Sequence, residues 1–362
     1  MSRNSSTKTA ELRQRRDAPL TTPTDLTRSA TITGVSSVAR TTTITLGGDL
    51  QVGRIGYGAM RLTGPNQWGE YPDRDGGIAL LRQAVEAGVT LIDTADAYGP
   101  HTNELLIREA LHPYPEHLVI ATKGGFVRGG LEYSTFEAIG NANYLRQCAY
   151  MSARRLGVER IDLYYLHSGW AKDASFEDQV GTLAELRRQG LIRHIGLSNV
   201  TPDQLRAARR IVAIAAVTAH FNVVARQEAT LLDAAIEAGA VFAPWRPVSL
   251  TAPGSPTDTG GPEAVRRVLD PIASRHGATI SQITLAWLLA RSPAIMPVPG
   301  TTSMAHLREN LDAQDIELSR EDIKSINSIA PERTATQSLP STGRKQYDSV
   351  GFRRDSHGKT SA

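Results

Sequence analysis

Between residues 42 and 298 the chain alternates short apolar runs with longer amphipathic stretches, eight times over. This alternation predicts parallel βα units, since a parallel strand pair needs a long crossover that usually contains a helix. Eight successive units favour an α/β fold of the (β/α)8 TIM barrel type over a doubly wound sheet. No G-x-G-x-x-G follows an apolar run, which also disfavours a Rossmann fold. The expected strands are Arg54–Tyr57, Thr90–Asp93, Leu118–Thr122, Ile161–Leu166, His194–Ser198, Ala216–Ala219, Val241–Pro244 and Ile295–Val298.

Local signals place a β-hairpin before these strands and helices between them. Gly47-Gly48-Asp49 separates Thr42–Leu46 from Leu50–Val52, which is typical of a hairpin. Thr201-Pro202 and Thr102 are typical of helix starts. Four glycines follow expected helices as C-terminal caps do: Gly88, Gly157, Gly190 and Gly239. The expected helices include Ile78–Glu86, Asn103–Ala110, Tyr144–Arg155, Phe176–Arg188, Pro202–Val212, Glu228–Glu237, Pro262–Arg275 and Ser281–Leu289.

The two ends of the chain differ from the middle in composition and charge. We expect a disordered extension over residues 1–40, one barrel domain over 41–330, and a disordered or loosely packed tail over 331–362. The ends carry net charges of +4 and +3, so a total of +3 leaves about −4 for the middle. The barrel therefore lacks the basic surface that a nucleic-acid-binding protein needs.

The cysteine content and the hydropathy of the chain limit the cellular compartments and the kinds of partner that we expect. The single cysteine, Cys148, excludes an internal disulfide and is too few for a cysteine-based metal site, so no metal is expected. No apolar run approaches the roughly 20 residues of a membrane helix, and the N-terminus lacks the apolar core of a secretory signal. We expect a cytoplasmic protein with no membrane partner, and a monomer by default because a barrel buries its own core.

Polar side chains end three successive expected strands. The apolar run from Val89 to Ile92 ends in Asp93, and Tyr98 follows shortly after it. The next two strands end in Lys123 and His167. Because the carboxyl ends of parallel strands meet at one face of a barrel, we expect these side chains to lie close together.

Asp, Tyr, Lys and His in this order suit proton donation to a carbonyl group. Free tyrosine titrates near pH ~10, and a nearby ammonium such as that of Lys123 favours its phenolate form. A buried lysine needs a counter-charge, which Asp93 supplies, and His167 can donate to the carbonyl oxygen. Taken singly, these residues also fit a helix cap, a loop aromatic, a surface lysine and a core histidine. Their joint placement at successive strand ends favours one site.

These residues stand in motifs that resemble the aldo-keto reductase family. Its D-T-A-x-x-Y-G matches residues 93–99, its T-K matches Thr122-Lys123, and its D-L-Y-x-x-H matches residues 162–167. The resemblance covers residues 42–328 and implies NAD(P)H-dependent reduction of an aldehyde or ketone to an alcohol. It also implies that Tyr98 is the general acid, that Lys123 and Asp93 tune it, and that His167 orients the carbonyl.

The resemblance extends to residues that would hold the cofactor. His194–Asn199 is similar to the family's G-x-S-N strand, whose Ser and Asn bind the nicotinamide carboxamide. Val298–Ser303 is similar to its last βα loop, which grips the adenosine phosphate with a helix start. NADPH is the implied cofactor, and NADH stays open because position 306 is not an arginine. His306 and Asn310 also fit a polar helix surface. The implied cofactor residues are Gly58, Met60, Ser198, Asn199, Thr218, Trp245, Gly300, Thr301, Thr302, His306 and Asn310.

One position departs from the family pattern, and others suggest a substrate. Thr218 stands where the family usually has a glutamine on the nicotinamide, whereas Trp245 matches an aromatic that stacks on that ring. The stretch Gly58–Gly64 resembles a bacterial subgroup that includes pyridoxal reductases, so pyridoxal is the first substrate to consider. A carbonyl of a specialised metabolite is equally compatible. Loop aromatics expected to shape the substrate site are Trp68, Tyr71, Phe126 and Trp170.

Two other functions stay open at this point. A cofactor-binding regulatory protein on the same barrel is favoured mildly by Thr218 and disfavoured by the intact set of four polar residues. An alcohol or sugar dehydrogenase working in the reverse direction would use the same groups, so the sequence does not fix the direction. In either direction the expected partner is a small molecule.

Overall fold

A computed structural model describes residues 42–132, 135–251 and 261–331. The expectations for residues 1–40, and for the tail beyond residue 331, lie outside this described part.

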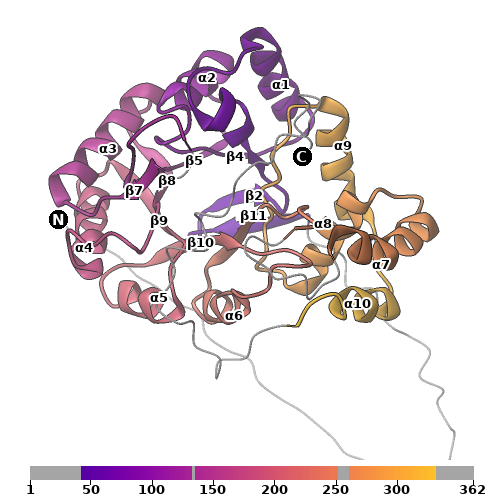
Figure 1. The fold of residues 1–362 in the computed structure, drawn as a ribbon. Helices are drawn as coiled ribbons and strands as arrows, with labels where there is room; N and C mark the ends of the chain where they lie inside the picture. The colour runs from indigo at the N-terminus through magenta and orange to yellow at the C-terminus, as the bar shows by residue number, and fades with distance from the viewer. Residues whose placement is uncertain (1–41, 133–134, 252–260, 332–362) are drawn as a thin grey trace, which may run out of the picture. The chain divides into compact units, whose positions relative to one another are not determined.

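A seven-stranded parallel sheet forms the centre, with the strand order β11-β10-β9-β8-β5-β4-β3. Helices lie around the outside of these strands, as Figure 1 shows. The sequence order is kept around the sheet, as expected for successive βα units. The strands are β3 (Tyr57–Gly58), β4 (Leu91–Asp93), β5 (Val119–Gly124), β8 (Ile161–Leu166), β9 (Ile192–Ser198), β10 (Ile214–His220) and β11 (Val241–Trp245).

An extended segment over residues 295–299 closes the ring between the two outer strands, β11 and β3. On one side, the backbone N–H groups of Met296 and Val298 donate to β11 at distances of 2.9 and 3.3 Å. On the other side, the carbonyls of Pro297 and Pro299 accept from Gly56 and Gly58. The two prolines have no N–H to donate back, so the ladder toward β3 is incomplete. The expected strand Ile295–Val298 is therefore not a regular strand, although the segment occupies its place, and the (β/α)8 TIM barrel is confirmed.

Arg54 ties this closing segment to the helix before it, which leads to a stability prediction. One guanidinium nitrogen, Nη2, donates to the carbonyls of Leu289, Ser292 and Ile295 at 3.0, 2.7 and 3.3 Å. A hydrogen bond from a charged donor contributes about 1.5–3 kcal/mol, and the three carbonyls share the two hydrogens of this one nitrogen. We expect Arg54→Met to lower the free energy of urea unfolding by about 2 kcal/mol. The exposed Arg209→Met is the control, and an equally small change in both variants would contradict the assignment.

A β-hairpin before the barrel packs against residues of the barrel strands. It consists of β1 (Thr43–Leu46) and β2 (Leu50–Gly53), as the sequence predicts. Leu46, Leu50 and Val52 are buried in one cluster with inward-facing residues of the barrel strands. The hairpin turn packs so tightly that a Cβ on Gly47 would lie 2.3 Å from the His194 ring. His194 also bonds Asp49 of the turn at 2.5 Å, which fixes the hairpin to β9.

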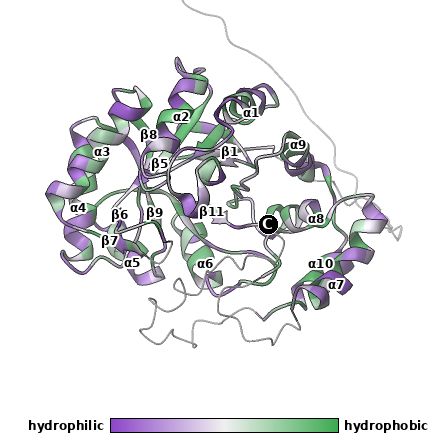
Figure 2. Cartoon of the chain, turned by 45° about the horizontal axis from the view of Figure 1, so that its top comes forward, coloured by the Kyte–Doolittle hydropathy of each residue, from purple (hydrophilic) through white to green (hydrophobic). Residues whose placement is uncertain are grey.

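The helices follow the predicted pattern, with ends that differ by a few residues. Figure 2 shows apolar and polar residues together on outer helices such as α1 and α3, as expected where one face packs on strands. All four predicted capping glycines have positive φ, and Thr201 forms a capping box with Gln204. Thr102 is the first residue of α2 rather than its cap, since its hydroxyl donates to the Gly69 carbonyl. The helices are α1 (Arg74–Glu86), α2 (Thr102–Leu111), α3 (Ala142–Leu156), α4 (Phe176–Arg188), α5 (Pro202–Arg209), α6 (Ala229–Glu237), α7 (Gly261–His276), α8 (Ile280–Arg291), α9 (Met304–Asp312) and α10 (Arg320–Asn327).

Two strands and one helix, β6, β7 and α10, have no counterpart among the expected elements. A second hairpin, β6 (Phe126–Arg128) with β7 (Phe136–Ala138), follows β5, and α10 follows α9. Among the described residues, no helix combines the length and apolar character needed to cross a membrane.

Candidate active site

Three of the predicted polar residues lie at neighbouring strand ends. Asp93 ends β4, Lys123 lies near the end of β5, and His167 follows β8 directly. The Lys123 ammonium donates to Asp93 Oδ1 at 2.5 Å and to the Thr94 carbonyl at 2.8 Å. Lys123 and Asp93 are both buried, so each provides the counter-charge that the other needs.

Tyr98 lies in the turn between β4 and α2, near Lys123 and His167. The Lys123 ammonium is 5.2 Å from the centroid of the Tyr98 ring. The ring centroids of Tyr98 and His167 are 6.0 Å apart in an edge-to-face arrangement. The turn is fixed by backbone bonds from Asp96 to the Lys123 carbonyl and from Gly99 to the Gln67 carbonyl. The structure thus brings the four sequence-predicted residues together at one end of the barrel.

Burial controls the charge of two members of this group. Desolvation lowers the pKa of His167 well below its usual range, and the Lys123 ammonium lowers it further. The imidazole is therefore neutral near pH 7 and can donate a hydrogen bond without carrying charge. Desolvation raises the pKa of Asp93, whereas the adjacent Lys123 acts in the opposite direction.

Residues of α2 and α3 support these strand ends and were not among the predicted site residues. Glu104 has no exposed surface and accepts from the Thr122 hydroxyl at 2.6 Å and from Arg155 Nε at 2.5 Å. Asn103 accepts from the Thr94 hydroxyl at 2.6 Å, so the residues next to Lys123 and Asp93 are both anchored. The only sequence signal was a polar pair on the buried face of an amphipathic helix.

Aromatic side chains border the group of four. Phe126 of β6 contacts the His167 ring edge-to-face, with centroids 4.7 Å apart, and its centroid is 6.5 Å from that of Trp170. Trp68 bridges to Gly99, next to Tyr98, and stacks under the Arg128 guanidinium. Tyr71, in contrast, packs on the apolar cluster of α1 and α2. Phe126, Trp170 and Trp68 are partly exposed, so they can contact a small molecule at this end.

The predicted nicotinamide residues lie at the ends of β9, β10 and β11. Ser198 ends β9, and Asn199 follows with a left-handed φ of 54°. Asn199 Nδ2 donates to the Ser198 hydroxyl at 2.9 Å, and the Trp245 indole donates to Asn199 Oδ1 at 3.2 Å. Thr218 is buried in β10 and donates its hydroxyl to the Ala243 carbonyl at 2.6 Å. Thr218 therefore bonds the neighbouring strand in place of a ligand.

The predicted phosphate residues lie between the closing segment and α9. Gly58 and Gly300 approach so closely that a Cβ on Gly300 would lie 2.8 Å from the Gly58 carbonyl. Thr301 is buried, with its hydroxyl accepting from the Ser303 N–H at 3.1 Å. Ser303 in turn caps α9.

The remaining residues of this group differ in exposure. Thr302 and His306 are exposed, Met60 is partly exposed, and Asn310 is 5% exposed. Asn310 therefore does not belong to a polar helix surface, whereas His306 is open to solvent.

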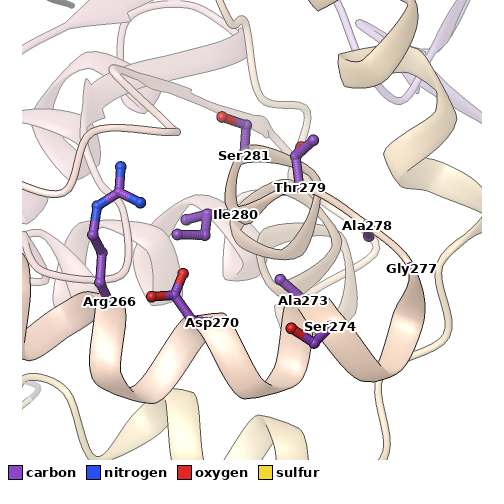
Figure 3. Close-up of a pocket in the computed structure, with 9 residues that line it drawn as sticks. All are labelled: Arg266, Asp270, Ala273, Ser274, Gly277, Ala278, Thr279, Ile280 and Ser281. Atoms are coloured by element: carbon purple, nitrogen blue, oxygen red, sulfur yellow. The ribbon is translucent and has the colours of Figure 1, made fainter.

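Elsewhere in the described chain, we find no second site that contains the predicted residues or suits a metal ion. A surface hollow between α7 and α8 contains none of the predicted site residues, and Figure 3 shows Arg266 and Asp270 projecting from α7 beside it. No group of His, Cys, Asp and Glu side chains suited to a metal ion occurs in the described ranges. The hollow is lined by Arg266, Asp270, Ala273, Ser274, Gly277, Ala278, Thr279, Ile280 and Ser281.

Comparisons with known sequences find a matching family model and several relatives. The model of the aldo/keto reductase family matches residues 54–331. An uncharacterized oxidoreductase of Schizosaccharomyces pombe is 41% identical over 274 residues, which cover 76% of this chain and 85% of the relative. The pyridoxine 4-dehydrogenase of Escherichia coli is 39% identical over 295 residues, covering 80% of this chain and 99% of the relative.

Solved structures with the same fold include two reductases. A thermostable aldo-keto reductase in complex with the inhibitor epalrestat is 30% identical, with a TM-score of 0.68 over 79% of this chain and 99% of that one. An aldo-keto reductase of Klebsiella pneumoniae in complex with NADPH is 22% identical, with a TM-score of 0.67 over 82% and 98%. The second likeness concerns the fold alone.

Proposed function

Because this chain belongs to the aldo/keto reductase family of oxidoreductases, we propose that it reduces an aldehyde or ketone to an alcohol with NADPH. The observation that carries the proposal is the placement of Tyr98 against the buried Lys123–Asp93 pair and His167. A phenol, an ammonium and a neutral imidazole at one barrel end can receive the oxygen of a carbonyl and protonate it.

Each residue then has a distinct task in the reduction. When bound, the reduced nicotinamide supplies a hydride to the carbonyl carbon. Tyr98 donates its hydroxyl proton to the carbonyl oxygen, and the Lys123 ammonium stabilises the negative charge left on Tyr98. Asp93 holds Lys123 in place and balances its charge. His167 donates a hydrogen bond to the same oxygen, which orients the carbonyl toward Tyr98.

The residues at the other strand ends fit a nicotinamide cofactor. Ser198 and Asn199 provide hydroxyl and amide groups for the carboxamide, beside the partly exposed indole of Trp245. The backbone of Gly58 closely approaches that of Gly300, and the chain runs from Gly300 to the start of α9, where backbone N–H groups suit a phosphate. Met60, Thr301, Thr302, His306 and Asn310 complete this proposed cofactor site, with Thr218 beneath it.

The aromatic border favours a flat substrate. Phe126 contacts His167, and Trp170 lies near Phe126, so a planar aldehyde could stack beside the reacting carbonyl. The 39% identical relative is a pyridoxine 4-dehydrogenase, which makes pyridoxal the first substrate to test. The name of that relative also favours a second function, oxidation of an alcohol of this kind by the same residues in reverse.

The test is turnover by the purified protein. NADPH and then NADH are supplied with pyridoxal and with a panel of aromatic and aliphatic aldehydes and ketones, and loss of absorbance by the reduced cofactor is followed. We expect NADPH oxidation that depends on the carbonyl, with the alcohol as product. Oxidation of pyridoxine with NADP⁺ is measured in parallel to establish the favoured direction. If the protein binds neither cofactor, the proposal is wrong.

A further inference from the structure

His220 and Trp245 form a stacked pair at the end of the barrel that carries the proposed cofactor site. His220 ends β10 and Trp245 ends β11, and the two residues are direct partners in the parallel pair of strands. Their ring centroids are 4.4 Å apart, with an angle of 11° between the ring planes. His220 is 8% exposed, so the imidazole is held almost entirely within the protein.

Asn222 fixes the orientation of the His220 ring. Its Oδ1 accepts from the backbone N–H groups of Val224 and Ala225, so its Nδ2 is the atom that faces His220. Asn222 Nδ2 lies 3.2 Å from His220 Nε2 and donates also to the Arg246 carbonyl at 2.9 Å. Since Nδ2 can only donate, Nε2 accepts, and His220 is the neutral form protonated at Nδ1.

The indole of Trp245 links the His220 ring to the end of β9. Its N–H donates to Asn199 Oδ1 at 3.2 Å, and Asn199 Nδ2 donates to the Ser198 hydroxyl at 2.9 Å. One continuous series of contacts thus crosses three strand ends and joins Asn222, His220, Trp245, Asn199 and Ser198. A ring stacked flat on one face of an indole limits its rotation, which in turn fixes the direction of its N–H.

We propose that His220 is a positioning residue that holds Trp245, and through it Asn199 and Ser198, in the arrangement that receives the nicotinamide end of the cofactor. This inference rests on the proposed function. It accounts for Thr218, whose hydroxyl is committed to the Ala243 carbonyl and which is therefore a poor cofactor ligand. His220 lies two residues further along the same strand and on the same side of it. A longer polar side chain at position 218 would help to hold the neighbouring groups of this site in place. Here the stacked pair of His220 and Trp245 does so instead.

His220 is uncharged near neutral pH. Burial lowers the pKa of His220 to about 3, and the Arg246 side chain contributes in the same direction. The imidazole therefore stays neutral between pH 5 and 9, and the contribution of His220 to cofactor binding has no pH dependence there.

The experiment separates stacking from general stability. His220→Leu removes the flat ring, and His220→Phe keeps a ring but removes the Nε2 acceptor. We expect His220→Leu to raise the Kd for NADPH about tenfold, measured by calorimetry, and His220→Phe to restore it to within about threefold of the natural protein. KM for NADPH is expected to follow Kd, whereas kcat and KM for the carbonyl change little. In a Trp245→Leu background, His220→Leu is expected to have no further effect on Kd.

Phe221 offers a matched control next to His220 in the chain. Its ring stacks on Trp287, with centroids 6.0 Å apart, in the core outside the site. Phe221→Leu is expected to lower Tm but to leave the Kd for NADPH unchanged.

Three outcomes overturn the inference. An unchanged Kd in His220→Leu removes the role of His220 while the proposed function stands. Equal losses in His220→Leu, His220→Phe and Phe221→Leu reveal a purely structural residue. A natural protein that binds neither NADPH nor NADH contradicts the proposed function and the inference together.

Discussion

Tyr98→Phe is expected to lower kcat by about 10²–10⁴-fold, the usual contribution of a general acid, while the Kd for NADPH stays within twofold. The substitution removes only the hydroxyl that donates the proton. The ring is expected to keep its place, because Lys123 and His167 both lie beside the ring itself. Steady-state turnover of the best carbonyl from the panel, together with calorimetric titration of NADPH, checks both halves of the prediction.

A second tyrosine near Lys123 supplies the control for this variant. The Lys123 ammonium is 5.7 Å from the Tyr165 ring, which is fully buried within β8. Tyr165→Phe also removes a hydroxyl near Lys123 but none that can reach a substrate, so kcat should change less than threefold. Full activity in Tyr98→Phe would exclude Tyr98 as the general acid. Equal losses in the two variants would point to a general disturbance around Lys123.

The strand ends were the most predictable part of the candidate site. Asp93, Lys123 and His167 each follow an apolar run, and a parallel barrel brings the ends of such runs to one face whatever the loops do. The sequence therefore predicts their proximity without any knowledge of distances. The position of Tyr98 is predictable for the same reason, because the turn that carries it starts at Asp93.

It was less predictable from the sequence which short segments pair as strands. The segment over residues 295–299 has the apolar pattern of a strand, but Pro297 and Pro299 leave it with half a ladder toward β3. The hairpin of β6 and β7 is short and only partly buried, so its sequence carries little alternation. Whether such segments pair depends on partners that lie far along the chain.

Contacts between side chains of different βα units could not be predicted from the sequence. Nothing in the pattern predicts that Trp245 donates to Asn199, or that His220 stacks on that indole, since the residues come from three different βα units. Likewise Glu104 looks like an ordinary helix residue until the fold places it under Thr122 and Arg155. These contacts are set by the geometry of the closed barrel.

Asp96, in the turn between Asp93 and Tyr98, leads to a prediction about stability and pH. Asp96 is 2% exposed. The pKa of Asp96 is raised to about 7, first by burial and then by the charge of Glu104, against the opposing effects of the Cys148 thiol, Arg155 and the Ala97 N–H. Between pH 3.8 and about 7, the unfolded chain has lost this proton while the folded protein keeps it. The folded state binds more protons in that window, so stability falls as pH rises, by about 4 kcal/mol in total.

Asp96→Asn is expected to remove this fall, because an amide does not titrate. Urea unfolding of the natural protein and the variant, from pH 4 to pH 8, should give free energies that diverge as pH rises, in favour of the variant and by up to about 4 kcal/mol. The slope is the decisive readout, since any packing cost of the amide is the same at every pH. Asp322→Asn is the opposite control: burial opposes its ionisation, but bonds from His276, Ser319 and Arg275 hold the pKa of Asp322 below its usual range, so its loss costs stability above pH 4. Parallel pH curves for the natural protein and Asp96→Asn would show that Asp96 is ionised in the fold, and that the turn carrying Tyr98 tolerates a second buried negative charge near Asp93.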